Sequence, residues 1–495
     1  MSRFSLSGNL KKGCNTQFGL KRAVGLSMIL FVFIIVSSIS RADELEDLLS
    51  GFEEEAVPTT DKDSEGNIDE LLGGFEEDNQ SFTLSDDPPE SVFPDWLELS
   101  GSLALQSTVN FSQQAPLPGQ PDYRGLSMFR GVAELLSDVH QDNWKARVGI
   151  AMFYDAAYLL NGQRKFYTDE FLNQYESEVR LNEAYLQADL SPKLDLKIGR
   201  QIVVWGKSDN IRVTDILNPL DLRWPGLVDI RFLRLPVTMT KLDYYRGNWN
   251  LGGIVIHEPR FNKFPVYNGE FYPFVRAIPE PEEPEVSWSN QQAAMSLSGI
   301  FSGWDIAFYA AYVFDKNPYF SDLESGQRQY ADVFFGGGAV NYAVGNWLLK
   351  GEAAFWDGLR FSTIEEDKQR VDMLVGVDYS GFTETTITLE FANRHLVDFD
   401  DRLSQSPDGQ KQDWQQFAFR LTRDFLNDTL HFTLLLSSYG IFAGEGGFER
   451  FQLEYDLSDN LTLTGGVVLY QSGDFPSFQD AGDNDRLLFE VEYRF

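Results

Sequence analysis

Hydrophobic and polar residues alternate along most of the chain. In the last ten residues every second position is apolar, at Leu487, Phe489, Val491, Tyr493 and Phe495, and most positions between them are charged. A period of two predicts β-strands that have one apolar and one polar face. Earlier segments with the same alternation are 305–312, 386–391, 416–422 and 450–455.

The connections between the predicted strands distinguish a membrane barrel from a soluble sandwich, because sandwiches alternate too. We predict strands that begin near Trp96, Gly125, Trp144, Val179, Leu194, Val237, Trp249, Gln291, Trp304, Val333, Asn346, Val371, Thr385, Trp414, Leu430, Phe448, Leu461 and Arg486. Short turns (191–193, 246–248, 302–303, 344–346, 380–381, 457–460) alternate with long connections (112–124, 161–177, 206–236, 258–290, 315–332, 394–413). This topology predicts an all-β fold, a transmembrane antiparallel up-and-down β-barrel of about 18 strands, with 16 as the alternative. An even count leaves both of its ends in the periplasm.

Two details of the strands carry further expectations. The chain ends on Phe495 two residues after Tyr493, and a terminal aromatic on an alternating last strand resembles the signal that delivers outer-membrane barrels to the barrel-assembly machinery. In the fifth strand Arg200 falls on the apolar side. A β-bulge at Gly199 would turn this side chain inward, or the side chain lies at the membrane interface, where charge costs less.

The N-terminus is typical of an exported protein. A basic region precedes the apolar run 23–39, and residues 40–42 (Ser-Arg-Ala) suit a cleavage site, so residues 1–42 are predicted to be a signal peptide. An uncleaved inner-membrane anchor is the alternative, although the run is short for a spanning helix of ~20 residues. The single cysteine, Cys14, precedes the run, which argues against a lipid anchor and leaves the mature chain without a disulfide.

Residues 43–95 form a strongly acidic segment, with 19 acidic residues and one lysine. Such a composition cannot bury a core, so we predict a disordered periplasmic segment ahead of a barrel that spans 96–495. Two similar units, LEDLLSGFEE from residue 45 and IDELLGGFEE from residue 68, repeat within it. They are either part of a solvated spacer or two copies of a docking peptide. In the docking interpretation the anchors are Leu48, Leu49, Phe52, Leu71, Leu72 and Phe75.

Composition limits the function. The chain has 41 Lys and Arg against 75 Asp and Glu, a net charge of −34, which argues against nucleic acid as a partner. Aromatic residues make up 14% of the chain, as expected of a barrel that carries aromatic girdles against outer-membrane lipid. The sequence therefore indicates the bacterial outer membrane as the location.

A barrel of this size usually encloses an aqueous channel, so passage of a solute is the expected function. The alternation predicts which charged residues face the lumen. They are Glu183, Lys197, Lys350, Glu352, Asp372, Glu390, Arg420, Arg450, Glu454, Glu490, Glu492 and Arg494.

The third long connection, residues 206–236, is the most distinctive segment and is called the third loop below. It mixes acidic and basic residues with more aliphatic residues than a water-exposed loop needs. In general porins the third loop folds inward, so we predict that this one narrows the channel through paired arginines and aspartates. A packed external cap is the alternative. The predicted constriction residues are Asp209, Arg212, Asp215, Arg223, Asp229, Arg231 and Arg234.

The sequence gives little support for catalysis, a cofactor or a metal site. Its histidines, His140, His257, His395 and His431, fall on different predicted elements, and no HExxH, GxSxG or phosphate-binding glycine motif occurs. The Gly336–Gly338 run lies within a strand and more plausibly permits a bend than binds phosphate. A lipid hydrolase that pairs His431 with Ser437 is the weakest alternative.

At residues 199–245 (GRQIVVWGKSDNIRVTDILNPLDLRWPGLVDIRFLRLPVTMTKLDYY) the sequence resembles a family of outer-membrane proteins of unknown function that are often encoded beside exporters of the RND superfamily. The LLxGFEE units also resemble segments of those proteins. The resemblance implies a barrel that works with an RND-type exporter, with hydrophobic or amphipathic cargo, and implies no catalytic residue. The leading hypothesis is a porin-like transport barrel. The alternative is a non-conducting surface or scaffold barrel that binds an external or periplasmic partner.

Overall fold

The computed structural model describes residues 94–228, 232–274, 276–405 and 409–495. The chain divides into two units, Met1–Asp86 and Asp87–Phe495, and the described residues all belong to the second. The signal peptide, the acidic segment and its repeats lie outside the described residues. No helix within the described ranges is long and apolar enough to cross a membrane.

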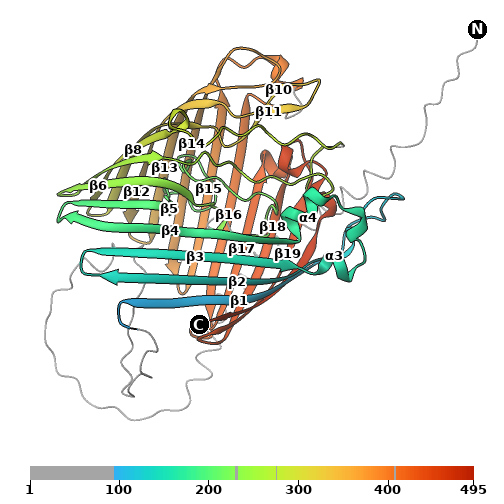
Figure 1. The fold of residues 1–495 in the computed structure, drawn as a ribbon, viewed down its shortest axis with the longest axis horizontal. Coiled ribbons are helices and arrows are strands. Elements are labelled where there is room, and N and C mark those ends of the chain that lie inside the picture. Colours follow the sequence, from blue (N-terminus) through green and yellow to red (C-terminus); the bar gives the residue numbers. More distant parts are fainter. Residues whose placement is uncertain (1–93, 229–231, 275, 406–408) are drawn as a thin grey trace, which may run out of the picture. The chain divides into compact units, whose positions relative to one another are not determined.

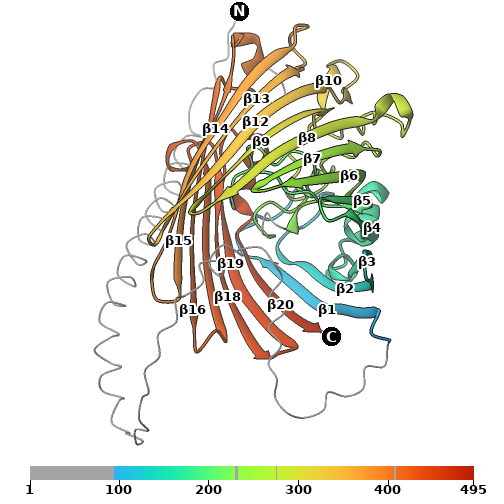
Figure 2. The same cartoon turned by 90° about the vertical axis from the view of Figure 1, so that its left-hand side faces the viewer.

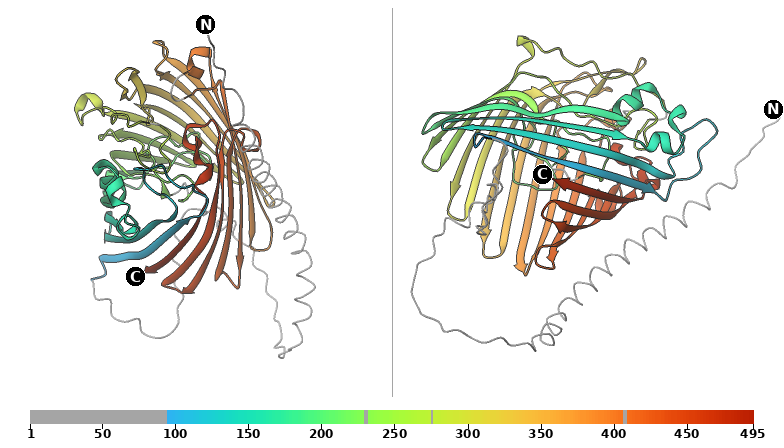
Figure 3. Two further views of the ribbon diagram at one scale, coloured as in Figure 1. Left: turned by 90° about the vertical axis from the view of Figure 1, so that its right-hand side faces the viewer. Right: turned by 60° about the horizontal axis from the view of Figure 1, so that its bottom comes forward.

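Eighteen antiparallel strands form one sheet that closes on itself. The strands are β1 (Leu97–Asn110), β2 (Gly125–Gln141), β3 (Trp144–Asp155), β4 (Ser177–Ser191), β5 (Leu194–Gln201), β6 (Val237–Arg246), β7 (Trp249–Ile256), β8 (Gln292–Phe301), β9 (Trp304–Phe314), β12 (Asp332–Val344), β13 (Trp347–Leu359), β14 (Lys368–Phe382), β15 (Thr385–Leu396), β16 (Asp413–Phe425), β17 (Leu430–Tyr439), β18 (Gly447–Ser458), β19 (Leu461–Gln471) and β20 (Arg486–Arg494). Each strand pairs with the next, and β1 pairs with β20 to close the barrel. Figures 2 and 3 show β1 beside β20 near the C-terminus. The predicted barrel and its 18 strands are confirmed.

The two faces of the strands differ as the alternation predicts. On β20 the side chains of Phe489 and Val491 are exposed on the outer surface, whereas Arg486, on the opposite face of the strand, is 1% exposed. On β15 Leu389 is 51% exposed whereas Ala392, on the opposite face, is fully buried. Because the outward side chains are apolar over most strands, the outer surface suits acyl chains and the inner surface can carry charge.

Long and short connections lie at opposite ends of the barrel. The short turns include 142–143, 192–193, 247–248, 302–303 and 345–346, where Gly247 and Gly345 take the positive φ that a tight reversal requires. Long connections carry the remaining elements, which are α3 (Ala157–Leu160), η2 (Arg164–Phe166), α4 (Asp169–Tyr175), η4 (Trp288–Asn290), the hairpin of β10 (Tyr319–Asp322) and β11 (Gln327–Gln329), η5 (Asp401–Gln405), η6 (Ile441–Ala443), η7 (Pro476–Phe478) and η8 (Ala481–Asp483). Figure 1 shows α3 and α4 beyond the ends of β3 and β4.

Arg200 remains on the outward face, so of the two alternatives for this residue the bulge at Gly199 is wrong. β5 keeps an unbroken register with β4 and β6 through both residues. Arg200 follows Ile198 on the outer surface and forms an ion pair with Glu258, which also accepts a 2.7 Å hydrogen bond from the Thr238 hydroxyl. Since β5 ends at the next residue, this pair lies at the rim of the barrel, where a neighbouring carboxylate and the interface reduce the cost of charge.

Candidate functional site: the third loop and its cavity

The apolar residues of the third loop are buried against the inner wall of the barrel. Ile211, Val213, Ile216 and Leu217 belong to one hydrophobic cluster with wall residues of β9 and of β12 to β16. Trp205, just before the loop, stacks on the ring of Tyr309 at 4.6 Å. This burial explains the excess of aliphatic residues, because an external loop would leave them in water.

Small inward residues on the wall make room for the loop. Ala307, Ala339, Ala354 and Ala392 are all buried within the same cluster. A Cβ added to Gly337 would lie 3.1 Å from the Thr214 methyl group and 2.8 Å from the Phe335 ring. Glycine at 337 therefore allows the loop to lie directly on β12, a contact that the sequence prediction of a bend did not anticipate.

Glu352 of β13 holds the first turn of the loop. Its buried carboxylate accepts hydrogen bonds from the backbone N–H groups of Lys207 (2.6 Å), Ser208 (2.8 Å) and Thr214 (3.0 Å), and from the Thr214 hydroxyl (2.7 Å). Gly206 has a φ of 90°, and a Cβ there would lie 2.7 Å from the same carboxylate. The turn thus needs both the glycine and the wall glutamate.

Glu390 of β15 holds the next stretch in the same way. Its carboxylate accepts hydrogen bonds from the N–H groups of Asp209 (2.9 Å), Asn210 (3.0 Å) and Ile211 (3.1 Å), and from the Ser208 hydroxyl (2.9 Å). Hydrogen bonds to an ionised acceptor are stronger than those between neutral groups. Glu352 and Glu390, named the clamp glutamates below, together accept eight hydrogen bonds from the loop.

Ion pairs add to the attachment of the loop that the clamp glutamates provide. Lys350 of β13 contacts the carboxylates of Asp209 and Asp378, the latter at 2.7 Å. Lys207 of the loop reaches Asp305 of β9 at 2.5 Å. The loop is therefore attached to β9, β13 and β15 by groups of both signs, and Lys350 also links β13 to Asp378 of β14.

The middle of the loop contains a compact charged group. Asp215 accepts a hydrogen bond from Arg234 at 2.8 Å and forms an ion pair with Arg212 at 3.0 Å, so that one carboxylate is shared by two guanidinium groups. Asn218, which the sequence analysis did not single out, accepts from the Val203 N–H at 2.8 Å and donates to the Leu235 carbonyl at 2.9 Å. These contacts tie the beginning and the end of the connection together.

Arg223 attaches the far part of the loop to β4 and α4. Its guanidinium is buried, bonds Asp221 and Glu178 at 2.6 and 2.8 Å, and lies over the Trp224 ring at 4.5 Å. Burial raises the pKa of the Asp221 carboxyl, but the hydrogen bonds from Arg223 outweigh it and hold that pKa below its usual range. Arg223 thus makes structural contacts and has little surface left to offer a solute.

The predicted constriction residues separate into three groups. Arg212, Asp215 and Arg234 meet in one cluster, Asp209 pairs with Lys350, and Arg223 is bound elsewhere. Asp229 and Arg231 lie outside the described residues. Of the predicted lumen residues, Lys350, Glu352, Asp372, Glu390 and Arg450 are buried. Several of the predicted lumen residues bind other side chains or the backbone: Glu183 forms an ion pair with Arg147, Asp372 with Arg370 and Arg494 with Glu492, Arg450 donates to the Gly226 carbonyl, and Glu490 accepts from Gln106.

A cavity of about 1220 Å³ remains between the third loop, the wall and the other long connections, and we call it the vestibule. Aromatic side chains from several elements line it, including Trp356, Trp414, Tyr439 and Phe475. Lys316, which follows β9, also lines the vestibule, and burial lowers the pKa of its ammonium group to about 8. No local pattern in the sequence indicates the vestibule, because its lining residues come from strands and connections far apart along the chain.

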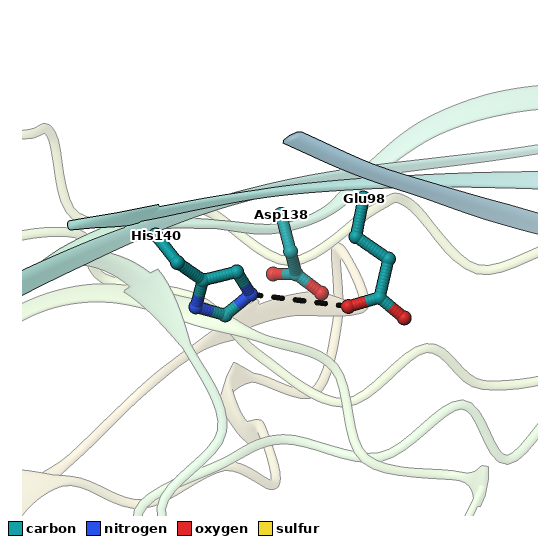
Figure 4. A group of neighbouring side chains, drawn as sticks. All are labelled: Glu98, Asp138 and His140. Carbon is teal, nitrogen blue, oxygen red and sulfur yellow. Dashed lines mark ion pairs between the residues drawn. The ribbon is translucent and has the colours of Figure 1, made fainter. Parts of the chain in front are cut away.

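His140 and His431 lie beside carboxylates, near the end of the barrel that carries the short turns. Figure 4 shows Glu98, Asp138 and His140, whose potential ligand atoms lie within 4.8 Å of one another. Both Asp138 oxygens already accept hydrogen bonds from Arg147, at 2.8 and 2.9 Å, which places a positive charge where a metal ion would bind. His431 contacts Asp424 at 2.7 Å and Asp456 at 3.3 Å.

The geometry does not support the hydrolase alternative. His431 and Ser437 are on the same strand, six residues apart, which corresponds to about 20 Å at the usual rise per residue. A nucleophile and its base must be within hydrogen-bond reach, at roughly 3 Å. The pairing of His431 with Ser437 is therefore wrong.

The closed barrel, its apolar outer surface and its charged inner surface define an outer-membrane β-barrel with a loop packed inside its lumen. Residues 107–495 match the family model described as a protein of unknown function, DUF1302. The chain belongs to the DUF1302 family. No curated protein matches the chain.

Solved structures that resemble the fold include outer-membrane proteins. OccAB3 of Acinetobacter baumannii is 12% identical, with 81% of this chain and 99% of that chain covered and a TM-score of 0.48. OccK9 (OpdG) of Pseudomonas aeruginosa is 10% identical over 81% and 98% of the two chains, with a TM-score of 0.48. OpdK of P. aeruginosa, solved with vanillate, is 11% identical over 80% and 98%, with a TM-score of 0.45.

Proposed function

We propose that the protein is a porin-like channel of the outer membrane, in which the third loop forms the constriction. The observation that carries this proposal is the attachment of the loop to the clamp glutamates inside an 18-stranded barrel, with the vestibule left on one side. A barrel of this width has room for an aqueous path beside one inserted loop. Charged groups of both signs along such a path would orient a dipolar solute.

Planar-bilayer conductance of the purified protein tests the proposal. Discrete single-channel openings are expected, and their conductance should rise when residues 206–236 are replaced by a short glycine-serine linker. Such a rise in conductance would show that the third loop restricts the path. If neither protein gives openings, the channel function is refuted.

A non-conducting barrel is the second candidate, and a specific observation favours it. The loop and the wall form a continuous hydrophobic cluster, which fills part of the lumen as a plug would. In that case the long connections would bind an external partner. Conductance only after removal of the loop would support this candidate over the channel.

We also propose that the acidic segment 43–95 docks to a periplasmic partner, with an RND-type exporter and amphipathic cargo as the specific hypothesis. Its support is the repetition of Leu48, Leu49 and Phe52 as Leu71, Leu72 and Phe75, because a plain spacer has no need to repeat apolar anchors. A crosslinking pull-down from cell envelopes should recover an inner-membrane exporter with the full-length protein. The control is a variant in which the four leucines are replaced by serine. Equal recovery with both proteins contradicts docking through the repeats.

A further inference from the structure

Strand β4 extends well past the end of β5 in the wall of the barrel. β4 has 15 residues and β5 has eight, and their register ends at the pair of Ala184 and Arg200. Figure 1 shows β4 running on from there toward α4. Among the described residues, 177–183 of β4 therefore have no strand beside them on that side. A strand that crosses the bilayer needs about 9–11 residues, so β5 falls short of the full height of the wall.

The outer half of β4 still presents apolar side chains to lipid where β5 has ended. On its other side it stays paired with β3, through Leu181 with Ile150 and Val179 with Met152. All four side chains are exposed, and Val179 is 76% exposed. At the end of β5, by contrast, the outward residue is the charged Arg200. The apolar outer surface therefore continues along β3 and β4 past a polar step in the wall.

Beyond Gln201 the chain leaves the wall and enters the barrel. Val203 is buried in the hydrophobic cluster that holds the third loop, and its N–H donates to the Asn218 side chain at 2.8 Å instead of to β4. On β4 the Leu181 carbonyl accepts a hydrogen bond from the Arg200 side chain at 3.5 Å. Side-chain contacts thus replace the strand-to-strand hydrogen bonds here. At membrane depth, such backbone is tolerated where it is buried in protein or lines a water-filled cavity.

The vestibule lies on the inner side of this part of β4. Successive side chains of a strand point to opposite faces, so Glu178 points inward where Val179 points to lipid. Glu178 lines the vestibule together with Arg223 and Lys263. Its carboxylate forms ion pairs with both cations, at 2.8 and 2.6 Å. We call these three residues the latch, because they hold the third loop and the connection after β7 against β4.

The latch can separate without disturbing the barrel. Its contacts join side chains, and none of them is a hydrogen bond between strands. Arg223 keeps Asp221 as a partner, at 2.6 Å, when Glu178 is released. Separation of the latch would therefore connect the vestibule with the outer surface beside 177–183 while every strand pair stays formed.

We propose that residues 177–183 of β4 and the departing segment 202–205 border a lateral portal in the wall. Through this portal an apolar molecule of single acyl-chain width passes between the outer leaflet of the membrane and the vestibule, and the latch keeps the portal closed. This inference goes beyond the proposed channel and does not rest on it, because the route leads sideways into lipid and not across the membrane.

The occupant of the portal follows from the surfaces that it joins. On the outside the portal is flanked by Val179 and by Val204, which is 56% exposed, and this surface is continuous with the lipid-facing side of β3. On the inside it leads to a vestibule lined by the rings of Trp414, Tyr439 and Phe475. A long apolar molecule would contact apolar side chains at both ends of the route, so it could enter without exposure of its chain to water.

Photolabelling of the full-length protein in lipid vesicles tests the portal. The probe is hexadecanol with a diazirine on its chain, which is uncharged and stays in the membrane, and mass spectrometry locates the labelled residues. We expect label on the vestibule residues Trp414, Tyr439 or Phe475 as well as on Leu389, which is half exposed on the outer face of β15. Leu389 is the internal reference, because its labelling needs no portal.

A double variant, Glu178→Cys with Lys263→Cys, opens and closes the portal in one protein. Cys14→Ser is included to remove the native cysteine. The reduced form lacks both ion pairs of the latch, so vestibule labelling should rise about tenfold or more over wild type. A short bis-thiosulfonate reagent that joins the two thiols should abolish this rise until a reductant restores it. The matched control joins Arg164→Cys to Glu176→Cys, an ion pair of the connection before β4, and should leave labelling unchanged.

Glu178→Gln is a second variant that needs no reagent. It keeps the size of the side chain and removes the charge that both cations share, and heat-modified migration on a gel verifies the folded barrel. Vestibule labelling should rise, whereas Glu176→Gln should match the wild-type protein. No vestibule labelling in any form, equal labelling of the reduced and bridged proteins, or no rise in Glu178→Gln overturns the portal. Bilayer conductance judges the channel separately, because labelling without current refutes the channel alone and current without bridge-dependent labelling refutes the portal alone.

Discussion

The clamp glutamates, Glu352 and Glu390, decide where the third loop lies. Each carboxylate accepts three hydrogen bonds from backbone N–H groups of the loop and one from a loop hydroxyl, so the wall presents negative charge where the loop presents its N–H groups. Backbone amides that leave the sheet must find partners when they are buried. The hydrogen bonds to Glu352 and Glu390 thus take the place of the strand-to-strand hydrogen bonds that the loop lacks.

Substitution of a clamp glutamate should loosen the loop. Glu390→Gln keeps the volume but loses the charge and one acceptor oxygen. A hydrogen bond to a charged group contributes roughly 1.5–3 kcal/mol, so the fraction of detached loop should rise about tenfold or more. We expect longer or larger openings in bilayer recordings and faster protease cleavage within residues 206–236.

The matched control for the clamp is Glu366→Gln, which changes an exposed glutamate on the connection between β13 and β14. It should leave both readouts at the wild-type level. Identical cleavage rates for Glu390→Gln and the wild-type protein would contradict the role of the clamp.

Lys316 should make ion selectivity depend on pH. Burial lowers the pKa of this lysine to about 8, so it is charged at pH 7 and largely neutral at pH 9. Loss of the positive charge of Lys316 favours the passage of cations. The reversal potential in a KCl gradient should therefore shift toward cation selectivity between pH 7 and pH 9. Lys316→Gln should be more cation-selective at pH 7 and show a smaller shift. A shift of the same size in the variant would assign the titration to another group.

At the scale of elements, the third loop packs inside the barrel as part of the hydrophobic core and does not resemble a flexible connection. Its hydrophobic side packs on alanines and glycines of the wall, and its polar side is held by ion pairs. The wall strands β9 and β12 to β16 are therefore adapted to a loop that connects β5 to β6. This division explains why several inward residues of those strands, among them Ala307, Ala339, Ala354 and Ala392, are small and apolar, whereas a water-filled lumen would favour polar side chains.

Leu217→Ala should release the loop without unfolding the barrel. Leu217 is fully buried in the cluster, and such substitutions cost about 2–5 kcal/mol. Protease cleavage within residues 206–236 should accelerate while the heat-modified migration of the barrel stays unchanged. Leu323→Ala, at a half-exposed position near β10, is the control. Loss of the folded barrel in Leu217→Ala would show instead that loop and barrel form one cooperative unit.

At the scale of the whole molecule, the barrel separates its charge from lipid. The closed sheet gives every strand a neighbour on both sides, and most of its outward side chains are apolar. Acidic and basic groups face the lumen and the long connections. The excess of acidic over basic residues in the chain is therefore compatible with a stable position of the barrel in the membrane.

An arginine on the outward face should destabilise the barrel. Leu389 lies near the middle of β15 and is half exposed, and Leu389→Arg should cost about 2–4 kcal/mol. Urea unfolding in lipid vesicles measures this difference. Glu134→Arg, on the inward face of β2, is the control and should change stability less. Equal effects of the two substitutions would mean that this face of β15 does not meet lipid.

The C-terminal aromatics should govern delivery to the membrane. Tyr493 and Phe495 are half exposed on the outside, and the Phe495 backbone pairs with Gly101 of β1. Replacing both side chains by alanine leaves those backbone hydrogen bonds intact but should lower outer-membrane accumulation several-fold. Leu487→Ala, at the other end of β20, should accumulate normally. Normal accumulation of the double variant would exclude the ending as an assembly signal.

The sequence by itself determined the fold of the described barrel. Alternation fixed which residues face lipid, and the lengths of the connections fixed the antiparallel topology, because both depend only on neighbours along the chain. The start of every strand, from Trp96 to Arg486, was predicted to within a few residues. The inward direction of charged residues such as Glu352 followed from the same alternation.

Only the tertiary structure decided which inward groups meet. Glu390 and Asn210 lie 180 residues apart, and Arg394 meets the Arg212 carbonyl across 182 residues. Such contacts depend on the curvature of the closed sheet and on the path of one loop through its interior, neither of which leaves a local pattern. For the same reason the vestibule and the group of Glu98, Asp138 and His140 could not be read from spacing along the chain.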